Sequence, residues 1–377
     1  MSVNRRNTLL NYGKQTLEQD DIDSVLEVLN TNTYLTTGPW VNKFEEKLCK
    51  YTGMKYAIAV SNGTAALHCA TFAAGINKGD EVIVTTLSFV ASANCIVYQN
   101  AIPVFVDINP DTMNINVDKI ESAITGKTKA IIVVDFAGQL CDYERIKNIA
   151  DKYNLIVIED AAHSVGITNP NDADLVTYSF HPVKNMTTGE GGAILTNNYE
   201  FAKKLKSFRS HGINNDYKSR YLHYYSMTDI GFNYRLTDIQ AALGISQLNK
   251  LKNWINIRND IARKYDNKLK ELYDYLEPIA KIRDSGYHIY IIKLKNLDRD
   301  TVYKMLREEN IGVNVHYKPI HLQPFYLDNY NTFEGQYPIS EEIYKNIITL
   351  PIFPTMNDKD VDYVVNAIKL VVYKLKN

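Results

Sequence analysis

Short apolar runs recur through the first two hundred residues, and polar, helix-length segments separate most of them. The runs cover residues 56–60, 81–86, 103–107, 130–136, 155–160, 175–180 and 192–196. Continuous apolar strands divided by helices, such as those expected over 63–74 and 141–153, predict a mostly parallel sheet with helices on both faces. The predicted fold is therefore α/β, and ligands of such sheets bind at the carboxyl ends of the strands.

The pattern changes on either side of this region. Ile22, Val25, Leu26 and Leu29 share one face of a predicted first helix, and a second helix follows through residues 44–48. Residues 200–250 read as mainly helical, with a polar, tyrosine-rich interruption at 214–229. A long helix near 253–272 then precedes a predicted strand (287–294), helix (301–311), strand (312–320) and final helix (361–375).

These patterns predict two parts and a short arm. Residues 13–250 are expected to form a large α/β domain, residues 251–377 a smaller C-terminal α+β domain, and residues 1–12 an N-terminal arm. The length of 377 residues suits this division.

Composition and charge narrow the function classes. The net charge is −1, so no overall field favours nucleic acid or an anionic membrane surface. No apolar run approaches the ~20 residues of a membrane span, and the N-terminus lacks the apolar core of a signal peptide. The four cysteines form no CxxC pair and no metal-ligand spacing with histidine, so we expect small buried hydrophobes in a reducing compartment. We expect a soluble cytoplasmic protein without a metal site.

Lys184 is the first candidate for chemistry. It lies in the turn-rich loop SFHPVKNMTTGEGG between two apolar segments. Glycines at the end of that loop would let the backbone approach a ligand closely. A partly desolvated lysine there would have a depressed pKa, and its free amine could condense with an aldehyde. A solvated surface lysine is the alternative, and Ser179 at the start of the loop could hold an anion.

Further candidates follow other strands. Gly63 and Thr64 would stand at a helix N-terminus, which favours a phosphate group, although an ordinary capped turn would look the same. Asp160 ends a buried strand and would face the ligand crevice, unless it only caps a helix, and His163 follows it. Phe89 comes just past another strand and could cover a flat ring or belong to the core.

Together these candidates are what pyridoxal 5′-phosphate requires. Its phosphate needs an anion site, its ring nitrogen a carboxylate, its ring an aromatic cover and its aldehyde a lysine. The combination favours the functional interpretation of each residue over the structural one.

At this point the sequence resembles the sugar-nucleotide aminotransferases, pyridoxal phosphate enzymes of the aspartate aminotransferase fold. The resemblance runs nearly end to end, and its motifs are LTTGPWVNKFEE, SNGTAALH, EDAAHSVG, SFHPVKNMTTGEGG, FRSHGI, FNYRLTDIQAALGISQL and VHYKPIHLQP. It is similar above all to enzymes that aminate position 4 of UDP-4-keto-6-deoxy-hexoses. The dehydratase branch carries histidine in place of Lys184, so the lysine favours amino transfer.

The resemblance implies a role for each candidate. Lys184 matches the lysine that carries the cofactor, Asp160 the partner of the ring nitrogen, and Phe89 the stacking aromatic. The remaining matches are His163 on the phenolic oxygen side, where many relatives have glutamine; Gly63, Thr64 and Ser179 in the phosphate cup; and Asn233, which reaches the phosphate of the neighbouring subunit in a homodimer with shared active sites.

Substrate residues are implied by position. Thr36, Thr37, His316 and Tyr317 match loops that line the sugar-nucleotide pocket, and Arg235, Lys318 and the His316 region could meet the pyrophosphate, although the cations could equally be surface ion-pair partners. The expected amino donor is glutamate, leaving 2-oxoglutarate. Two alternatives stay open. One is an aminotransferase that acts at carbon 3 or on a dTDP or GDP keto sugar, and the other is a non-catalytic sensor with the same fold.

Overall fold

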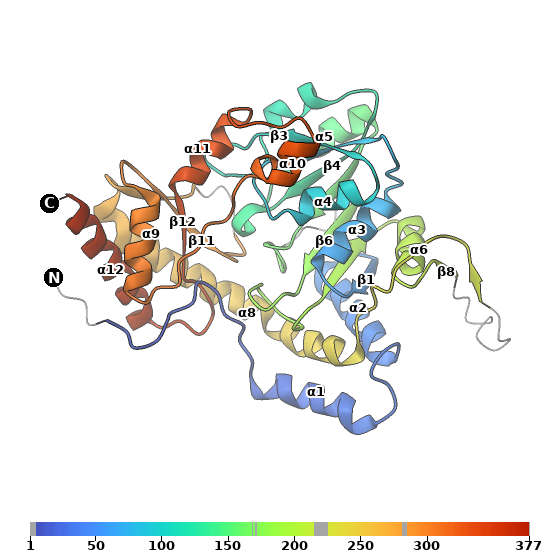
Figure 1. The fold of residues 1–377 in the computed structure, drawn as a ribbon. Helices are drawn as coiled ribbons and strands as arrows, with labels where there is room; N and C mark the ends of the chain where they lie inside the picture. The colour runs from blue at the N-terminus through green and yellow to red at the C-terminus, as the bar shows by residue number, and fades with distance from the viewer. Residues whose placement is uncertain (1–4, 168, 170–171, 215–224, 281–284, 377) are drawn as a thin grey trace.

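The computed structural model describes residues 5–167, 169, 172–214, 225–280 and 285–376. Its first sheet, shown with its helices in Figure 1, has the strand order β1-β7-β6-β5-β4-β2-β3. Strand β7 runs antiparallel to both of its neighbours, and the other pairs are parallel. The strands are β1 Tyr56–Val60, β2 Glu81–Thr85, β3 Ile102–Val106, β4 Thr128–Val134, β5 Ile156–Asp160, β6 Leu175–Ser179 and β7 Gly192–Thr196.

All seven predicted runs are therefore strands of one sheet, within about two residues at either end. The α/β class is confirmed. These strands could be predicted from the sequence because they are buried on both faces and therefore form continuous apolar runs.

Helices cover both faces of this sheet. Alternate strand side chains point to opposite faces, so Ile58, Val84 and Ile132 join one core with α3, α4 and α6. Ala59, Val176 and Leu195 face α2 and α8 on the other side, and α5 covers the neighbouring strands there. The bounds are α1 Gln19–Thr31, α2 Pro39–Thr52, α3 Gly63–Ala73, α4 Ala91–Tyr98, α5 Tyr143–Tyr153, α6 Tyr199–Phe208 and α8 Asp238–Leu269.

Helix α8 crosses the molecule. It begins at a capping box formed by Thr237 and Gln240, and the helix predicted near 253–272 is its second half. Its first half packs against α1 and α2, and its last turns enter a separate apolar core. The predicted boundary at residues 250 and 251 lies within this helix, and the two-domain division stays a prediction.

The C-terminal core surrounds a three-stranded antiparallel sheet of order β10-β11-β12. Leu10 of the N-terminal arm belongs to this core and forms a bridge with Ile311. The remaining bounds are α9 Arg299–Glu308, α10 Pro324–Asn329, α11 Pro338–Asn346, α12 Asp358–Lys376, β8 Ile213–Asn214, β9 Ser226–Met227, β10 Leu276–Pro278, β11 Tyr290–Leu294 and β12 Ile347–Leu350, with 3-10 turns η1 Val117–Lys119, η2 Glu121–Ala123, η3 Phe136–Gly138, η4 Lys270–Leu272 and η5 Ile320–Leu322.

The strand predicted over 312–320 is wrong. Its backbone bonds go to different partners: the N–H of Gly312 donates to Leu10, that of Asn314 to Thr349 and that of Ile320 to Thr86. No ladder can form from bonds so divided, and β12, which the sequence did not reveal, pairs with β11 instead. The segment crosses from the small sheet to the carboxyl ends of the large one.

Three cysteines, Cys69, Cys95 and Cys141, are buried free thiols, and Cys49 is partly buried. The prediction of small buried hydrophobes is confirmed for these three, whereas Cys49 is only partly buried. Within the described part of the chain, no helix is both long enough and apolar enough to cross a membrane.

Candidate active site

The carboxyl ends of β2, β5 and β6 bring several predicted residues to one place. Asp160 ends β5 and is buried. Its Oδ2 accepts a hydrogen bond of 2.7 Å from the Ser92 hydroxyl, and its Oδ1 accepts one of 3.2 Å from the Ala162 N–H. Burial raises the pKa of Asp160, whereas these donors and the charge of Lys184 lower it. A cation placed within hydrogen-bond distance of this carboxylate would therefore be stabilised.

Lys184 lies opposite in a loop that several contacts hold. Its N–H donates to the His181 carbonyl at 2.9 Å, and Asn185 donates its side-chain amide to the Gly286 carbonyl at 3.1 Å. The N–H of Thr187 donates to Oε1 of the buried Gln247. The loop is thereby fastened to α8 and to the segment after β10, and the lysine is held by a rigid backbone.

The Lys184 amine is tuned by its surroundings. Burial lowers its pKa to about 8, and the negative charge of Asp160 opposes that shift. A substantial fraction of the amine is then neutral near pH 8, as a nucleophile or a proton carrier requires.

Gln247 extends this fastening to the N-terminal segment. While its Oε1 accepts from Thr187, its Nε2 donates to the Thr16 carbonyl and to Oδ2 of Asp21 in α1. One buried amide thus joins the lysine loop to the first helix.

His163 forms one wall of the site. Its Nδ1 accepts the N–H of Ala137 at 3.3 Å, so the proton of the neutral ring sits on Nε2, which lies 3.2 Å from the Tyr317 hydroxyl. Burial lowers the pKa of His163 far below its usual range, and the Lys184 charge adds to the effect. His163 is therefore a neutral donor with one fixed tautomer.

Two further histidines surround this wall. The ring of His288 lies 4.4 Å from that of His163. His316 is hydrogen-bonded to Thr349 at 2.8 Å, and Tyr12 of the arm packs on its ring. Burial lowers the pKa of His316 to about 3. The predicted residues His316 and Tyr317 thus reach the site, although not from a strand.

Gly63 and Ser179 form the predicted anion cup. Helix α3 begins at Gly63, and the Asn62 side chain accepts the N–H of Ala65. The helix start then leaves the N–H groups of Gly63 and Thr64 without intrahelical acceptors. A Cβ on Gly63 would lie 2.8 Å from the Cβ of Ser179, so only glycine allows this close approach. Backbone donors, a helix dipole and a hydroxyl meet there, as a phosphate requires.

Phe89 follows β2 and is 56% exposed. Its ring centroid lies 6.2 Å from that of Tyr317. An aromatic side chain so exposed beside a buried lysine and carboxylate can cover a flat ring, and the core alternative does not fit its exposure.

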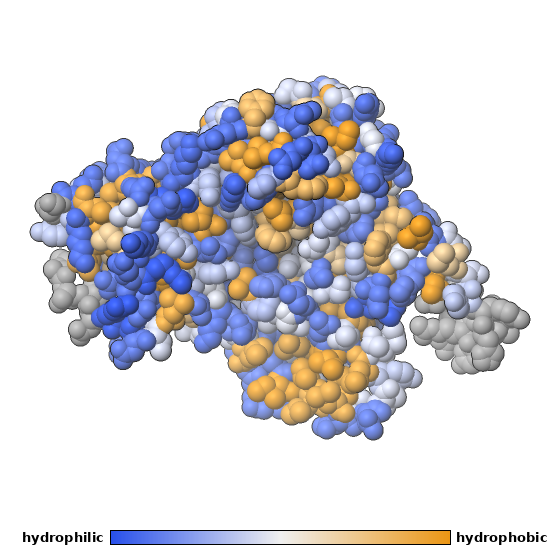
Figure 2. Space-filling model, viewed as in Figure 1, coloured by the Kyte–Doolittle hydropathy of each residue, from blue (hydrophilic) through white to orange (hydrophobic). Residues whose placement is uncertain are grey.

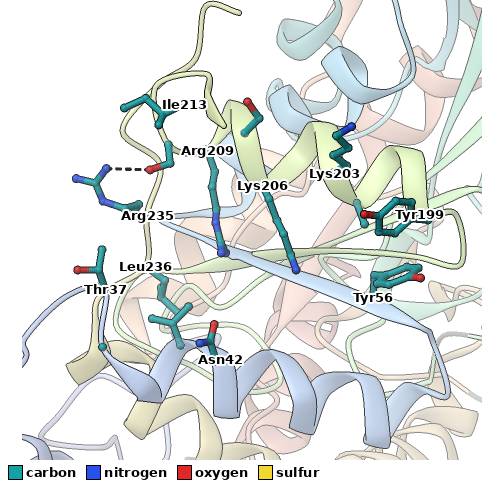
Figure 3. A pocket seen from close by; sticks show the side chains of 15 residues that line it. Thr37, Asn42, Tyr56, Tyr199, Lys203, Lys206, Arg209, Ile213, Arg235 and Leu236 are labelled. Carbon is teal, nitrogen blue, oxygen red and sulfur yellow. Dashed lines mark hydrogen bonds between the residues drawn. The ribbon is translucent and has the colours of Figure 1, made fainter. Parts of the chain in front are cut away.

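In the described part of the chain, the other predicted residues form no hydrogen bond, ion pair or ring contact with Lys184. Thr37 and Arg235 line a second cavity, drawn in Figure 3, whose lining does not include the lysine. Thr36 bridges to Thr237, the exposed Asn233 bridges to Ser210, and Lys318 is exposed. Arg235 bridges to Val60 at the end of β1, close to the anion cup, and the roles of all five residues stay predictions.

The sequence analysis missed Ser92, His288 and Tyr12. Ser92 lies four residues after Ser88, one helical turn away, and the two hydroxyls are 2.8 Å apart. That spacing beside Phe89 was the available signal for Ser92. His288 and Tyr12 come from distant segments whose proximity no local pattern indicates.

The residues present fit pyridoxal phosphate. The phosphate would fit beside Gly63, where there is no room for a side chain, and could bind two backbone N–H groups and the Ser179 hydroxyl. The buried Asp160 carboxylate suits a protonated ring nitrogen. Lys184 and Phe89 complete the set. The chemistry of this set of residues indicates pyridoxal phosphate as the cofactor.

Comparisons with known proteins also indicate a pyridoxal phosphate enzyme. Spore coat polysaccharide biosynthesis protein SpsC of Bacillus subtilis is 36% identical over 98% of this chain and 99% of that protein. Helicobacter pylori PseC, described as an aminotransferase involved in the biosynthesis of pseudoaminic acid, superposes with a TM-score of 0.91, 32% identity, and coverage of 97% of this chain and 100% of that one. Spr1654 from Streptococcus pneumoniae, in its PLP form, gives a TM-score of 0.90, 29% identity, and coverage of 97% and 99%.

The family assignment follows from these matches and from the site. Residues 15–369, nearly the whole chain, match one family description. The protein is a pyridoxal phosphate-dependent aminotransferase with the fold of its relatives. The chain belongs to the DegT/DnrJ/EryC1/StrS aminotransferase family.

Proposed function

We propose that the protein moves an amino group from glutamate to carbon 4 of a nucleotide-linked 4-keto-6-deoxy sugar, in the first instance a UDP sugar. The observation that carries the proposal is the Lys184 amine, whose pKa burial lowers to about 8 beside the buried Asp160 carboxylate. The motifs that resemble sugar 4-aminotransferases, and the sugar pathways named for PseC and SpsC, support the choice of substrate.

The roles of the residues follow from their positions. Pyridoxal phosphate supplies an aldehyde that captures amines and a ring that accepts electrons. Lys184 would hold the aldehyde carbon at rest and, once freed by the donor, carry a proton between that carbon and the substrate carbon. A pKa of about 8 lets one amine both accept and return that proton.

The other residues hold and orient. Asp160 would keep a proton on the ring nitrogen, while Gly63, Thr64 and Ser179 would bind the phosphate and Phe89 would cover the ring. His163, a fixed Nε2 donor, would face the phenolic oxygen. His316 and Tyr317 would line the sugar pocket, and Thr36, Thr37, Arg235 and Lys318 are proposed for the nucleotide portion.

We also propose a homodimer in which Asn233 reaches the neighbour's phosphate site. Asn233 is exposed in the single chain. Helix α1 presents the apolar side chains of Ile22, Leu26 and Leu29 outward, each close to half exposed, as the patch over α1 in Figure 2 shows. A second copy of the chain would bury this surface, which is of the kind that marks an interface.

An absorbance spectrum tests the first half of the reaction. Protein loaded with pyridoxal phosphate should show the visible band of lysine-bound cofactor, and glutamate should convert it to the pyridoxamine form. Lys184→Ala should show neither the band nor the conversion, with turnover at least ~10³-fold lower. A variant that still transaminates would contradict the assignment of Lys184.

A panel of keto sugars then tests the second half. UDP-, dTDP- and GDP-linked 4-keto and 3-keto sugars are offered to the pyridoxamine form, and return of the visible band identifies the acceptor. A band that glutamate leaves unchanged would rule out glutamate as donor. Failure with every sugar, despite normal cofactor binding, would favour the sensor alternative.

A further inference from the structure

Two buried carboxyl groups lie next to the cofactor site, on the α5 side of the large sheet. Glu159 and Asp160 end β5, and both are buried. Because successive side chains of a strand point to opposite faces, Glu159 points away from the site that Asp160 faces. It is hydrogen-bonded there to Asp135, which follows the neighbouring strand β4 and is fully buried. The proposed reaction gives neither Glu159 nor Asp135 a role.

The register of the strands brings these two groups together. Glu159 pairs with Val133, and Asp135 lies two residues further along on the same face. Tyr143 of α5 is a neighbour of both. Its hydroxyl donates to Oδ1 of Asp135 at 2.9 Å, and its pKa is raised by burial and by the charges of both carboxyl groups. The strand register and the shared neighbour therefore agree in placing the two carboxyl groups side by side.

The hydrogen bonds of Asp135 decide where a proton lies. A carboxylate only accepts, so a hydrogen bond between two carboxyl groups requires a proton on one of them. Asp135 accepts three further donors. These are the Cys141 N–H at 3.0 Å and the hydroxyl groups of Tyr143 and Ser164 at 2.9 and 2.6 Å. Donors of this kind stabilise the anion, so Asp135 is the carboxylate and Glu159 is the protonated donor.

The Asp135 carboxylate joins the two turns that hold His163. Ser164, which donates to this carboxylate, directly follows His163 in the turn after β5. The Cys141 N–H, which donates to it as well, closes the loop that contains Ala137. The Ala137 N–H in turn donates to Nδ1 of His163 at 3.3 Å. One carboxylate thus fixes both segments that set the direction of the His163 ring.

We propose that Asp135 and Glu159 share one proton and act as a positioning pair for His163. Glu159 carries the proton and holds the Asp135 carboxylate. The carboxylate holds the two turns, and the turns direct the Nε2 donor of His163 to the phenolic oxygen side of the cofactor. The effect on amino transfer rests on the proposed function, whereas the shared proton is a property of the protein alone.

Infrared spectroscopy of the apoprotein tests the shared proton. A buried protonated carboxyl group absorbs apart from carboxylates, and its band shifts in D2O. The wild type should show such a band at neutral pH, and Glu159→Gln should lack it. Glu144→Gln is the matched control, because Glu144 is an exposed residue of α5 and its loss should leave the band unchanged. A band that keeps its full intensity in Glu159→Gln, or a wild type without one, would overturn the shared proton.

Two replacements of Glu159 test its role as a donor. Glu159→Gln should keep the rate of the glutamate-driven spectral change within about threefold of the wild type, because the amide still donates to Asp135. Glu159→Leu has a similar volume and no donor, and should slow the change about tenfold. Equal losses in the two variants would show that Glu159 does not act by donating to Asp135.

A double-mutant cycle tests whether the pair acts through His163. Asp135→Asn should slow the glutamate-driven change about tenfold. In a His163→Ala background the same replacement should cost less than about threefold, because the residue to be positioned is absent. A tenfold loss in both backgrounds would mean that Asp135 supports the fold in general, and would overturn the positioning role. If Asp135→Asn does not fold, Ser164→Ala, which removes one of the bonds to Asp135, takes its place in the cycle.

Failure of the positioning pair and failure of the proposed function give different results. A wild type whose visible band glutamate leaves unchanged contradicts glutamate as the donor. The infrared difference between the wild type and Glu159→Gln is still measured, since it needs neither cofactor nor substrate. The cycle is then read from the affinity for pyridoxal phosphate, to which the Nε2 donor of His163 would contribute, and additive losses would again overturn the positioning role.

Discussion

At the scale of single residues, the lysine and the carboxylate control each other. Burial lowers the pKa of Lys184 and raises that of Asp160, and each charge opposes the shift of the other. The site thus keeps a reactive neutral amine available close to neutrality without removing its counter-charge. Two predictions follow at this scale.

The first concerns pH. Only the neutral amine attacks an aldehyde, and protonation removes it below the pKa of about 8. The rate at which pyridoxal phosphate loads onto the apoprotein should therefore fall about tenfold per pH unit below pH 8 and level off above it. Stopped-flow absorbance between pH 6.5 and 9.5 measures this rate. A midpoint near pH 10 would mean that the amine is not desolvated.

The second separates the two roles of Asp160. In Asp160→Asn the negative charge that holds up the Lys184 pKa is lost, so the loading midpoint should move below that of the wild type. Amino transfer should nevertheless fall by about 10²-fold or more, because the ring nitrogen loses its anionic partner. Ser92→Ala, which removes one hydrogen bond to Asp160, should change both quantities less. Parallel falls in loading and transfer at every pH would contradict this separation.

At the scale of elements, the site depends on close packing where strands end and helices begin. The start of α3 lies against the end of β6 through Gly63 and Ser179. The free edge of β1 is blocked by side chains at Ala59. Glu45 accepts the Ala59 N–H at 2.9 Å, and Arg209 donates to the Ala59 carbonyl. An edge so occupied cannot pair with a strand from another molecule at this point.

Gly63→Ala should lower both stability and cofactor affinity. The added Cβ would lie 2.8 Å from that of Ser179, and such overpacking costs about 1–3 kcal/mol. Thermal unfolding and pyridoxal phosphate titration measure the two losses. Ser179→Gly in the same chain should restore most of the stability but not the affinity, because the hydroxyl is lost. Gly126→Ala, which meets no atom within 4 Å, is the control. An unchanged melting temperature in Gly63→Ala would refute the contact.

Glu45→Ala should destabilise the fold by about 3 kcal/mol, because it leaves a largely buried Arg209 charge and the Ala59 N–H without partners. Urea unfolding measures the change. Glu45→Gln keeps an acceptor for the N–H and should lose less. Equal losses in the two variants would show that the charge of Glu45 contributes little.

The sequence predicts elements whose residues form a local pattern, and it does not predict elements that depend on contacts between distant segments. Strands buried on both faces, such as β5 and β6, are visible as apolar runs, and the residues that end them, Asp160 and Ser179, could be predicted as site residues. Segment 312–320 has similar residues but divides its hydrogen bonds among three partners, and β12 is short and follows directly on α11. Contacts between distant segments, such as Tyr12 with His316, leave no local pattern.

At the scale of the whole molecule, the first helix faces outward. Asp21 and Val28 of α1 turn inward, whereas Ile22, Leu26 and Leu29 form a surface that the described part of the single chain leaves uncovered. Figure 1 shows α1 projecting from the body, and Figure 2 shows the apolar patch on it.

Leu26→Glu should therefore convert a dimer to monomers, because it places a charge within the proposed apolar interface. Light scattering coupled to gel filtration measures the mass. Thr31→Glu adds the same charge on another face of α1 and should leave the dimer intact. If the wild type is monomeric at micromolar concentration, or Leu26→Glu remains dimeric, the α1 surface is not the interface.

Gln247 gives this arrangement a thermodynamic consequence. The same buried amide holds Thr187 in the lysine loop, and Thr16 and Asp21 in the segment that leads into the proposed interface. An ordered lysine loop therefore favours an ordered N-terminal segment around Thr16 and Asp21, and the reverse also holds. Linkage is reciprocal: if pairing of two chains tightens the hold on pyridoxal phosphate, then pyridoxal phosphate must tighten the pairing by the same factor. The apoprotein should dissociate at a higher concentration than the loaded form, and the melting temperature of both should rise with protein concentration.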